Sequence, residues 1–220
     1  MNRLWEAALD LLFPPKCPFC RALLQKGEEG LCASCREHLP WLEGGGAETA
    51  VDFLSLCVSP LRYRDLVRES VHRYKFSGGT AYAAVYGRLV ADCVEERLSG
   101  RFDLVTWPPL SRRRLRQRGY DQAKLLAQEA ARCLGAEAGP LLEKVRHTRA
   151  QSGLGGDSGA RRANVLGAYR PLSPEALTGK RVLLIDDVVT TGSTLSECAW
   201  TLRTAGAADV VGCALAKAGK

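Results

Sequence analysis

An apolar run followed by two acidic residues and a small, hydroxyl-rich turn constrains the fold of this chain most strongly. Residues 182–185 read Val-Leu-Leu-Ile without interruption, which is typical of a parallel strand covered on both faces. Asp186 and Asp187 follow where this strand is expected to end, and a helical pattern begins at Leu195 and continues towards Thr204. The stretch therefore predicts a strand, a turn and a helix within the open sheet of an α/β protein.

The turn between this strand and this helix predicts a phosphate-binding loop. It consists of small residues, most of them with a hydroxyl group: Thr190, Thr191, Gly192, Ser193 and Thr194. Ligands of open α/β sheets bind at the carboxyl ends of the strands. A turn that opens a helix there offers unpaired backbone N–H groups and the positive end of the helix dipole, and a glycine allows close approach to the backbone. The alternative is that these hydroxyls only cap the helix.

The acidic pair predicts the other half of the same ligand site. Bare carboxylates repel a phosphate, so we expect Asp186 and Asp187 to meet sugar hydroxyls or a hydrated Mg²⁺. The stretch from Arg181 to Leu195 resembles the signature by which type I phosphoribosyltransferases bind 5-phosphoribosyl 1-pyrophosphate (PRPP). The resemblance implies the α/β fold of that family, a parallel central sheet flanked by helices. It also implies that the acidic pair lies near the ribose as the catalytic residues and that the turn holds the 5-phosphate.

The length and charge of the chain narrow the range of functions. Its 220 residues suggest one medium domain, or a small module joined to a larger one, with a self-sufficient core. A net charge of +7 favours anionic partners such as nucleotides or nucleic acid. Residues 1–13 carry Glu6 and Asp10 and are too short and too polar to cross a membrane, so their apolar spacing predicts a short amphipathic helix. We expect no membrane insertion.

The nine cysteines fall into two groups. With no signal peptide before them, they indicate a cytoplasmic protein with reduced thiols. Four form two C-x-x-C pairs, which aim their thiolates at one point and predict a tetrahedral structural zinc site: Cys17, Cys20, Cys32 and Cys35. A redox C-x-x-C is the alternative. The other five sit in apolar patterns and predict buried, inert thiols: Cys57, Cys93, Cys133, Cys198 and Cys213.

These features predict two structural units. We expect residues 1–42 to hold the N-terminal helix and a zinc ribbon, and residues 50–220 to form the phosphoribosyltransferase-like domain. Between residues 39 and 52 the chain is rich in glycine and small residues, as linkers are. Because so short a ribbon has no core of its own, bound metal should supply most of its folding free energy, on the order of 10 kcal/mol.

Apolar periodicity predicts the remaining elements of the larger unit. Strands are expected at 51–60, from 103, at 141–145, at 165–169 and at 209–216. Helices are expected at 64–76, 80–98 and 123–133. In the first of these helices, the residues expected to face inward are Leu66, Val67 and Val71. Residues 146–164 are polar and rich in glycine and arginine, and the resemblance implies a loop there that closes over the pyrophosphate and excludes water.

A run of arginines predicts a second contact with an anion. Residues 112–118 contain five arginines, which repel one another unless an anion neutralises them. We favour a polyphosphate or a nucleic-acid backbone as this anion, and the alternative is a solvated basic turn of helix. In the resembled fold, the loop before this run wraps the pyrophosphate with backbone amides. The residues expected at the pyrophosphate are Lys75, Pro108, Leu110, Ser111, Arg112 and Arg116.

The order of several smaller motifs resembles the ComF family. The two C-x-x-C pairs precede Tyr-Lys-Phe-x-Gly at 74–78, Pro-Leu-Ser-x-Arg at 109–113, Arg-Gly-Tyr-Asp-Gln at 118–122, Gln151, Arg-x-Asn-Val at 162–165, and the PRPP signature. This order spans nearly the whole chain and is more specific than any motif alone. Members of that family are linked to DNA uptake in the natural transformation of bacteria.

Three functions are compatible with the sequence. The first, which we favour, is a PRPP-binding phosphoribosyltransferase-family protein that acts in DNA uptake; the sequence leaves open whether it also transfers the phosphoribosyl group, and to which acceptor. The second is a non-catalytic single-stranded DNA-binding protein of the same fold, in which the arginine run, Tyr74 and Tyr120 supply charge and stacking. The third is a docking platform, built on the zinc ribbon, for a helicase or another competence protein.

Overall fold

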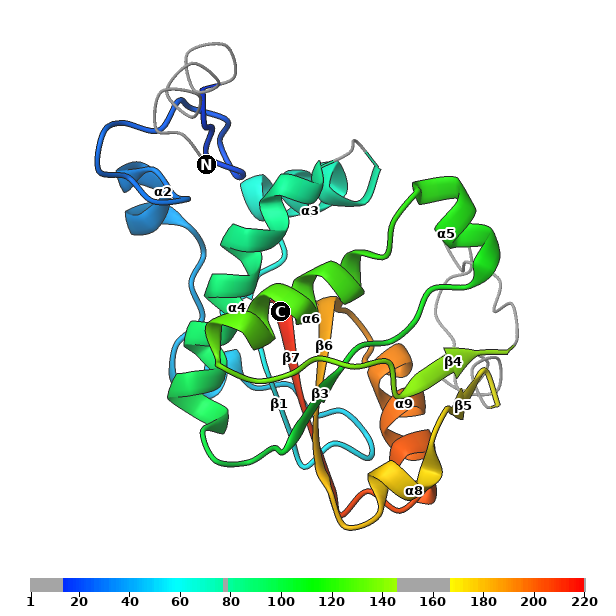
Figure 1. The fold of residues 1–220 in the computed structure, drawn as a ribbon. Coiled ribbons are helices and arrows are strands. Elements are labelled where there is room, and N and C mark those ends of the chain that lie inside the picture. The colour runs from blue at the N-terminus through cyan, green and yellow to red at the C-terminus, as the bar shows by residue number, and fades with distance from the viewer. Residues whose placement is uncertain (1–13, 77–78, 146–166, 220) are drawn as a thin grey trace.

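The computed structural model describes residues 14–76, 79–145 and 167–219 (Figure 1). The helix expected at 1–13 and the polar loop expected at 146–164 lie outside the described residues. The helices are α2 (Ala33–His38), α3 (Asp65–Phe76), α4 (Tyr82–Leu98), α5 (Arg112–Arg118), α6 (Gln122–Cys133), α8 (Pro174–Leu177) and α9 (Ser193–Thr204), with 3₁₀ turns η1 (Gly44–Ala47) and η2 (Gly79–Ala81). Among the described residues, no helix combines the length and the apolar character that a membrane span needs.

A parallel sheet forms the centre of the molecule. Its strands are β1 (Leu56–Val58), β2 (Leu61–Arg62), β3 (Leu104–Thr106), β6 (Arg181–Val189) and β7 (Asp209–Lys217). β7 lies between β1 and β6, β3 pairs with the other edge of β6, and β2 also pairs with β7. A separate antiparallel pair consists of β4 (Leu142–Lys144) and β5 (Tyr169–Pro171).

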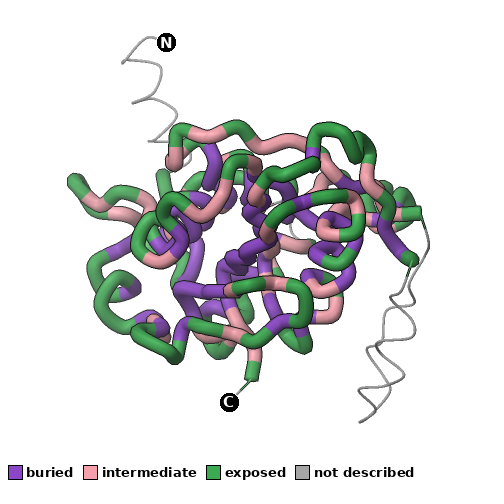
Figure 2. Tube along the Cα trace, turned by 90° about the horizontal axis from the view of Figure 1, so that it is seen from below, coloured by how far each residue is buried: buried purple, intermediate pink, exposed green. Residues whose placement is uncertain are grey.

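Helices cover both faces of this sheet. Along β6, Leu183 and Ile185 pack into the core that α3, α4 and α6 share, whereas Val182 and Leu184 pack with α8 and α9. Successive residues of a strand point to opposite faces, so an unbroken apolar run is what a strand covered on both faces requires. Figure 2 shows the buried residues gathered along the interior of the chain trace. The predicted α/β fold with a parallel central sheet is confirmed.

The acidic pair lies inside β6 and not after it, which corrects the predicted end of this strand. β6 stays paired with β7 beyond the carboxylates, and this pairing reaches Val189 and Lys217. The helix that follows begins at Ser193, two residues before the predicted Leu195. The acidic pair is therefore carried by a backbone segment that is paired within the central sheet.

Three other expectations need correction. The strand expected at 51–60 is shorter, because its first residues form a turn closed by a hydrogen bond from the N–H of Leu54 to Val51. Within the described residues, the strand expected at 165–169 begins only at Tyr169. Of the five cysteines expected to be buried, all are buried except Cys133, which is half-buried.

Helix α3 buries a narrower stripe than the sequence predicts. Val67 and Val71 are fully buried, and they lie one turn apart on the same face. Leu66 is 40% exposed, because it precedes Val67 by one position, roughly 100° around the helix. The inward face of α3 is completed by Ser70 and Tyr74.

The N-terminal module packs against the larger unit. A β-bridge between Lys16 and Leu23 closes its first knuckle, and α2 carries part of the second C-x-x-C pair. Phe19 is 1% exposed, and the centroid of its ring lies 5.5 Å from that of Tyr86 in α4. The module therefore shares a hydrophobic core with α3 and α4. The boundaries of two units at 1–42 and 50–220 stay a prediction.

Candidate functional site

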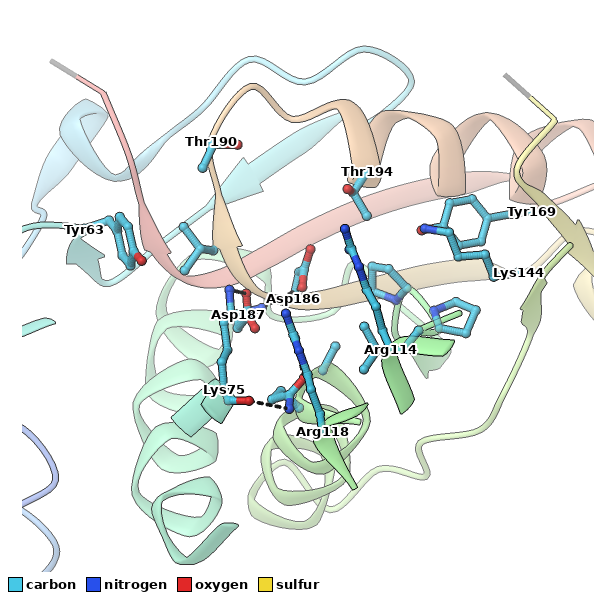
Figure 3. A pocket seen from close by; sticks show the side chains of 16 residues that line it. Tyr63, Lys75, Arg114, Arg118, Lys144, Tyr169, Asp186, Asp187, Thr190 and Thr194 are labelled. Atoms are coloured by element: carbon cyan, nitrogen blue, oxygen red, sulfur yellow. Dashed lines mark hydrogen bonds and ion pairs between the residues drawn. The ribbon is translucent and has the colours of Figure 1, made fainter. Parts of the chain in front are cut away.

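A polar cavity of about 270 Å³ lies at the carboxyl ends of β3 and β6 (Figure 3). Seven of the residues expected to bind PRPP line it: Lys75, Pro108, Leu110, Asp186, Asp187, Thr190 and Thr194. Six others do not line it: Ser111, Arg112, Arg116, Thr191, Gly192 and Ser193. The lining also contains side chains that the sequence did not assign to the site, above all Tyr63, Arg114, Arg118, Lys144 and Tyr169.

The two carboxylates of the cavity differ in their surroundings. Asp187 is buried, and its Oδ1 lies 2.7 Å from Nζ of Lys75 at the end of α3. Asp186 is half-buried, and its Oδ1 accepts a hydrogen bond of 2.8 Å from the backbone N–H of Asp187. Desolvation and the neighbouring charge of Asp187 raise the pKa of Asp186 to about 7. One carboxylate is thus already paired with a cation, while the other has no ion pair with any of the residues that the structure describes.

Four cationic side chains from the described part of the chain line the cavity with the acidic pair: Lys75, Arg114, Arg118 and Lys144. Desolvation opposes the charge on Lys75, but the charges of the acidic pair outweigh it and raise the pKa of Lys75. Desolvation and the nearby Arg114 lower the pKa of Lys144, whose Nζ donates to the hydroxyl of Tyr169 at 3.0 Å. In Figure 3, Lys75, Arg114 and Arg118 extend from their helices towards the acidic pair. Such a cavity favours an anionic ligand.

Two of the five arginines of α5 line the cavity. Ser111 is buried and caps this helix, because its Oγ accepts a hydrogen bond of 3.4 Å from the N–H of Arg114. Arg114 and Arg118 are one turn apart and share the face that lines the cavity. Arg112 and Arg116, the pair expected at the pyrophosphate, are exposed on another face. Both pairs show the same spacing in the sequence, so spacing alone does not tell which pair faces the cavity.

The loop between β3 and α5 contributes Pro108 and Leu110 to the cavity wall. The N–H of Leu110 donates to Oδ2 of Asp121 at 3.0 Å. Oδ1 of the same carboxylate accepts from the N–H of Lys124 in the first turn of α6, at 3.1 Å. Asp121 therefore fixes this loop to α6, and the Leu110 amide is already satisfied in this conformation.

The turn at 190–194 opens onto the same cavity. Gly192 has a φ of 75°, in the left-handed region, and a Cβ atom at this position would lie 2.9 Å from Cγ2 of Val51. Glycine is thus required here by both backbone conformation and packing. Among the described residues, no acceptor forms a hydrogen bond with the backbone N–H groups of Thr194 and Leu195 in the first turn of α9. These amides leave the N-terminus of α9 available to an anion.

The hydroxyl groups of the turn do not fill the cavity. Oγ1 of Thr191 and Oγ of Ser193 lie 2.7 Å apart and bond to each other, and neither residue lines the cavity. Thr190 and Thr194 line it together with the basic side chains, and in Figure 3 Lys75 and Arg118 lie on the opposite side of the acidic pair from these threonines. The turn and the basic groups therefore face one shared space.

A second candidate site is formed by the four N-terminal cysteines: Cys17, Cys20, Cys32 and Cys35. Their Sγ atoms all lie within 4.8 Å of one another. A tetrahedron with Zn–S bonds of about 2.3 Å separates its sulfur atoms by roughly 3.8 Å, so the cluster has the size of a ZnS₄ site. This convergence favours one structural zinc site over two separate redox pairs. His38 bonds to the carbonyl of Ser34 through Nδ1 and stands outside the cluster.

The parallel sheet, the basic cavity at its carboxyl edge and the four-cysteine cluster define a protein of the type I phosphoribosyltransferase fold with an N-terminal zinc ribbon. Comparison with protein families agrees on both parts. A double zinc ribbon domain matches residues 8–45, and a phosphoribosyl transferase domain matches residues 121–219.

Three relatives resemble this chain over most of their length. "DNA utilization protein YhgH" of Salmonella typhimurium is 32% identical over 91% of this chain and 96% of its own. "Competence protein F" of Haemophilus influenzae is 28% identical, with 92% and 97% covered. "Competence protein ComFC" of Streptococcus pneumoniae is 29% identical, with 93% and 82% covered. The chain belongs to the ComF family, as the order of its motifs predicts.

Solved structures resemble only part of this chain. The glutamine PRPP amidotransferase from B. subtilis is 20% identical over 64% of this chain and 30% of its own, with a TM-score of 0.43. The phosphoribosylpyrophosphate synthetase from Mycobacterium smegmatis is 20% identical over 60% of this chain and 33% of its own, with a TM-score of 0.39. The chain thus spans about a third or less of the length of these enzymes.

Proposed function

We propose that this protein binds PRPP together with Mg²⁺ in the cavity at the carboxyl ends of β3 and β6, and that it acts in DNA uptake. One observation carries the proposal: a single cavity combines an acidic pair, the N-terminus of a helix and four cationic side chains. PRPP presents the complementary groups, since its ribose hydroxyls lie between a phosphate and a pyrophosphate. The names of the relatives, which refer to competence and DNA utilization, support the role in DNA uptake.

Each part of the ligand finds a matching element. The turn at 190–194 suits the 5-phosphate, because the helix after it offers unpaired amides. Asp186 and Asp187 suit the ribose hydroxyls or a hydrated Mg²⁺, for which carboxylate oxygens are preferred ligands. The basic side chains beyond the acidic pair suit the pyrophosphate: Lys75, Arg114 and Arg118.

Transfer of the phosphoribosyl group is the reaction that such a site supports. A nucleophilic acceptor would bond to C1 of the ribose while the bond from C1 to the pyrophosphate oxygen breaks, and pyrophosphate would leave with the electron pair. Mg²⁺, when bound, supplies positive charge to the phosphate oxygens. Lys75, Arg114 and Arg118 would stabilise the charge that grows on the leaving group. Lys75 and Arg118 are already oriented in this structure, by Asp187 and by Oε1 of Gln122.

Isothermal titration calorimetry with PRPP and Mg²⁺ tests the binding. We expect the wild-type protein to bind and Asp186→Asn to bind at least about tenfold more weakly, a loss of about 1.4 kcal/mol. Asp92→Asn is the matched control, because Asp92 lies on the exposed face of α4 and pairs with Arg88 there. A folded wild-type protein that shows no heat of binding at two temperatures would remove PRPP as the ligand.

Single-stranded DNA binding is a second candidate, and the outer face of α5 favours it. Arg112, Arg113 and Arg116 are exposed there, and none has an acidic partner among the described residues. Tyr74 cannot contribute the stacking that the sequence suggested, because it is fully buried and its hydroxyl donates to the backbone of α6. Tyr120 is half-buried. Docking of a helicase or another competence protein stays a prediction.

A further inference from the structure

Helix α3 is fastened to the backbone of the first zinc knuckle. Nη2 of Arg73 donates to the carbonyl oxygen of Pro18 at 2.9 Å and to that of Phe19 at 2.7 Å. The hydroxyl of Ser70 donates to the same Pro18 carbonyl. Both carbonyls lie between the two cysteines of the knuckle at 17–20. The position of α3 is therefore tied directly to the chain that carries two of the four thiolates.

Apolar packing strengthens this connection. The ring of Phe19 lies 5.5 Å from that of Tyr86, which in turn lies 5.2 Å from that of Tyr74 on α3. All three rings are buried, and Cys17 belongs to the same cluster. A displacement of the knuckle would therefore change contacts along the whole inner face of α3.

The opposite face of α3 reaches the phosphoribosyl cavity. Lys75 follows Arg73 by two positions, about 200° around the helix, so the two side chains point in opposite directions. Nζ of Lys75 pairs with the buried carboxylate of the cavity at 2.7 Å. The carbonyls of Tyr74 and Lys75 accept hydrogen bonds from Tyr120 and Gln122, which hold the last turn of α3 beside α6. One short helix thus contacts both candidate sites.

We propose that Arg73 is a positioning residue that couples the zinc site to the phosphoribosyl cavity. Four thiolates that hold one Zn²⁺ fix the knuckle carbonyls, Arg73 holds α3 against these carbonyls, and α3 keeps Lys75 at the pyrophosphate side of the cavity. The inference rests on the proposed function, because it concerns the affinity of that cavity for a pyrophosphate group. Coupling between two sites is reciprocal, so pyrophosphate in the cavity must also strengthen the retention of zinc.

Three substitutions in the full-length protein separate this coupling from a local role. Arg73→Met keeps an apolar stem and removes the donors to the knuckle. Arg73→Lys keeps a cationic donor that can reach the carbonyls, so it should restore part of the effect. Arg68→Met makes the same change of charge at an exposed position of the same helix and serves as the matched control.

Two quantities are measured for each protein. The first is the Kd of inorganic pyrophosphate with Mg²⁺, by titration calorimetry; the second is the rate of zinc transfer to a chromogenic chelator, with and without pyrophosphate. In the wild type we expect pyrophosphate to slow zinc transfer. Arg73→Met should weaken pyrophosphate binding on the order of tenfold, within the usual range for coupled sites, and abolish the protection of zinc. Arg68→Met should match the wild type in both measurements.

Several results would overturn the coupling. One is an unchanged Kd of pyrophosphate in zinc-loaded, folded Arg73→Met. If this variant also transfers zinc faster than the wild type while its pyrophosphate Kd is unchanged, Arg73 stabilises the ribbon alone. Should Arg73→Met fail to fold, the wild type before and after zinc removal gives the same comparison, and an equal Kd in both states contradicts the proposal. A wild type that binds no pyrophosphate removes the proposed function as well, whereas binding without coupling removes only this inference.

Discussion

Nζ of Lys75 lies 2.7 Å from Oδ1 of Asp187, and this ion pair joins the last turn of α3 to the central strand β6. Both side chains are largely shielded from water, with 21% of Lys75 and 10% of Asp187 exposed. A sugar or a metal that binds this carboxylate must compete with the ammonium group, and a pyrophosphate nearby would attract that group away. The pair therefore links the binding of the two halves of the proposed ligand.

Removal of Lys75 should destabilise the fold, because it leaves a buried carboxylate without its partner. We expect Lys75→Met to lower the free energy of unfolding by about 3 kcal/mol. The double variant Lys75→Met/Asp187→Asn should recover most of this loss, since neither group then carries a charge. Urea denaturation at neutral pH measures the difference. Equal stability of the single and the double variant would show that the pair does not stabilise the protein.

The contribution of the same pair should depend on pH with a definite sign. Desolvation lowers the pKa of Lys75, but the charges of Asp187 and Asp186 outweigh it, so the pKa is raised on folding. A raised pKa contributes stability that is fully present below the unfolded value, about 10.4 for lysine, and is lost as the pH rises through the folded value. The stability gap between wild type and Lys75→Met should therefore persist at neutral pH and shrink in strongly alkaline solution, which denaturation curves between these two pH ranges would show.

The arginines of α5 allow a test of which helix face contacts the ligand. We expect Arg114→Gln and Arg118→Gln each to weaken PRPP binding by about tenfold, since charge-assisted contacts to phosphate are commonly worth about 1.5–3 kcal/mol. Arg112→Gln and Arg116→Gln remove the same charge from the exposed face and should change the Kd little. Titrations of all four at one salt concentration make the comparison. An equal loss in all four would mean that net charge, and not contact in the cavity, attracts the ligand.

The sequence predicts the centre of this site better than its rim. Asp186, Asp187 and the turn at 190–194 are contiguous in the chain, so one motif contains them together with the strand and helix that hold them. Lys144 and Tyr169 come from the two strands of a separate small sheet, and no local pattern brings them to the cavity. Their places depend on long-range packing, which a single sequence does not show.

Two further differences between expectation and structure concern the loop and the helix after β3. The arginine run contains two pairs at helical spacing, and the structure turns Arg114 and Arg118 to the cavity in place of the expected Arg112 and Arg116. The loop before this run was expected to offer its amides to pyrophosphate, yet Asp121 already binds the amide of Leu110. The four zinc-binding cysteines were easier to identify, because thiolate pairs at this spacing serve few other purposes in a reduced protein.

The exposed arginines of α5 allow a test of single-stranded DNA binding through the dependence of its affinity on salt concentration. Each phosphate contact on a single strand contributes about 0.7 to the slope of log K against log salt. Replacement of Arg112, Arg113 and Arg116 by Gln should therefore reduce this slope by about 2 for an oligothymidine, measured by fluorescence anisotropy. PRPP binding should persist in the triple variant, because none of the three side chains lines the cavity. A slope equal to that of the wild type would exclude this face as the DNA contact.

Alanine substitutions at Gly192 and at Gly179 distinguish the cost of a left-handed backbone from the role of the turn at 190–194 in PRPP binding. Both have left-handed backbones, with φ of 75° and 71°, but a Cβ at Gly179 meets nothing within 4 Å, whereas one at Gly192 meets Cγ2 of Val51 at 2.9 Å. We expect Gly179→Ala to cost about 1 kcal/mol of stability from the left-handed conformation alone and to leave PRPP binding unchanged. Gly192→Ala should cost more and weaken PRPP binding, because relief of the contact moves the turn at the cavity.

A compensating change makes this last comparison decisive. Val51→Ala removes the γ-methyl groups that a Cβ at Gly192 would meet, so it should restore part of the PRPP affinity of Gly192→Ala while the left-handed strain persists. Urea denaturation and PRPP titration of the single and double variants follow stability and binding separately. If Gly192→Ala binds PRPP as tightly as the wild type, the backbone of the turn does not hold the 5-phosphate, and the anion must rely on the basic side chains across the cavity.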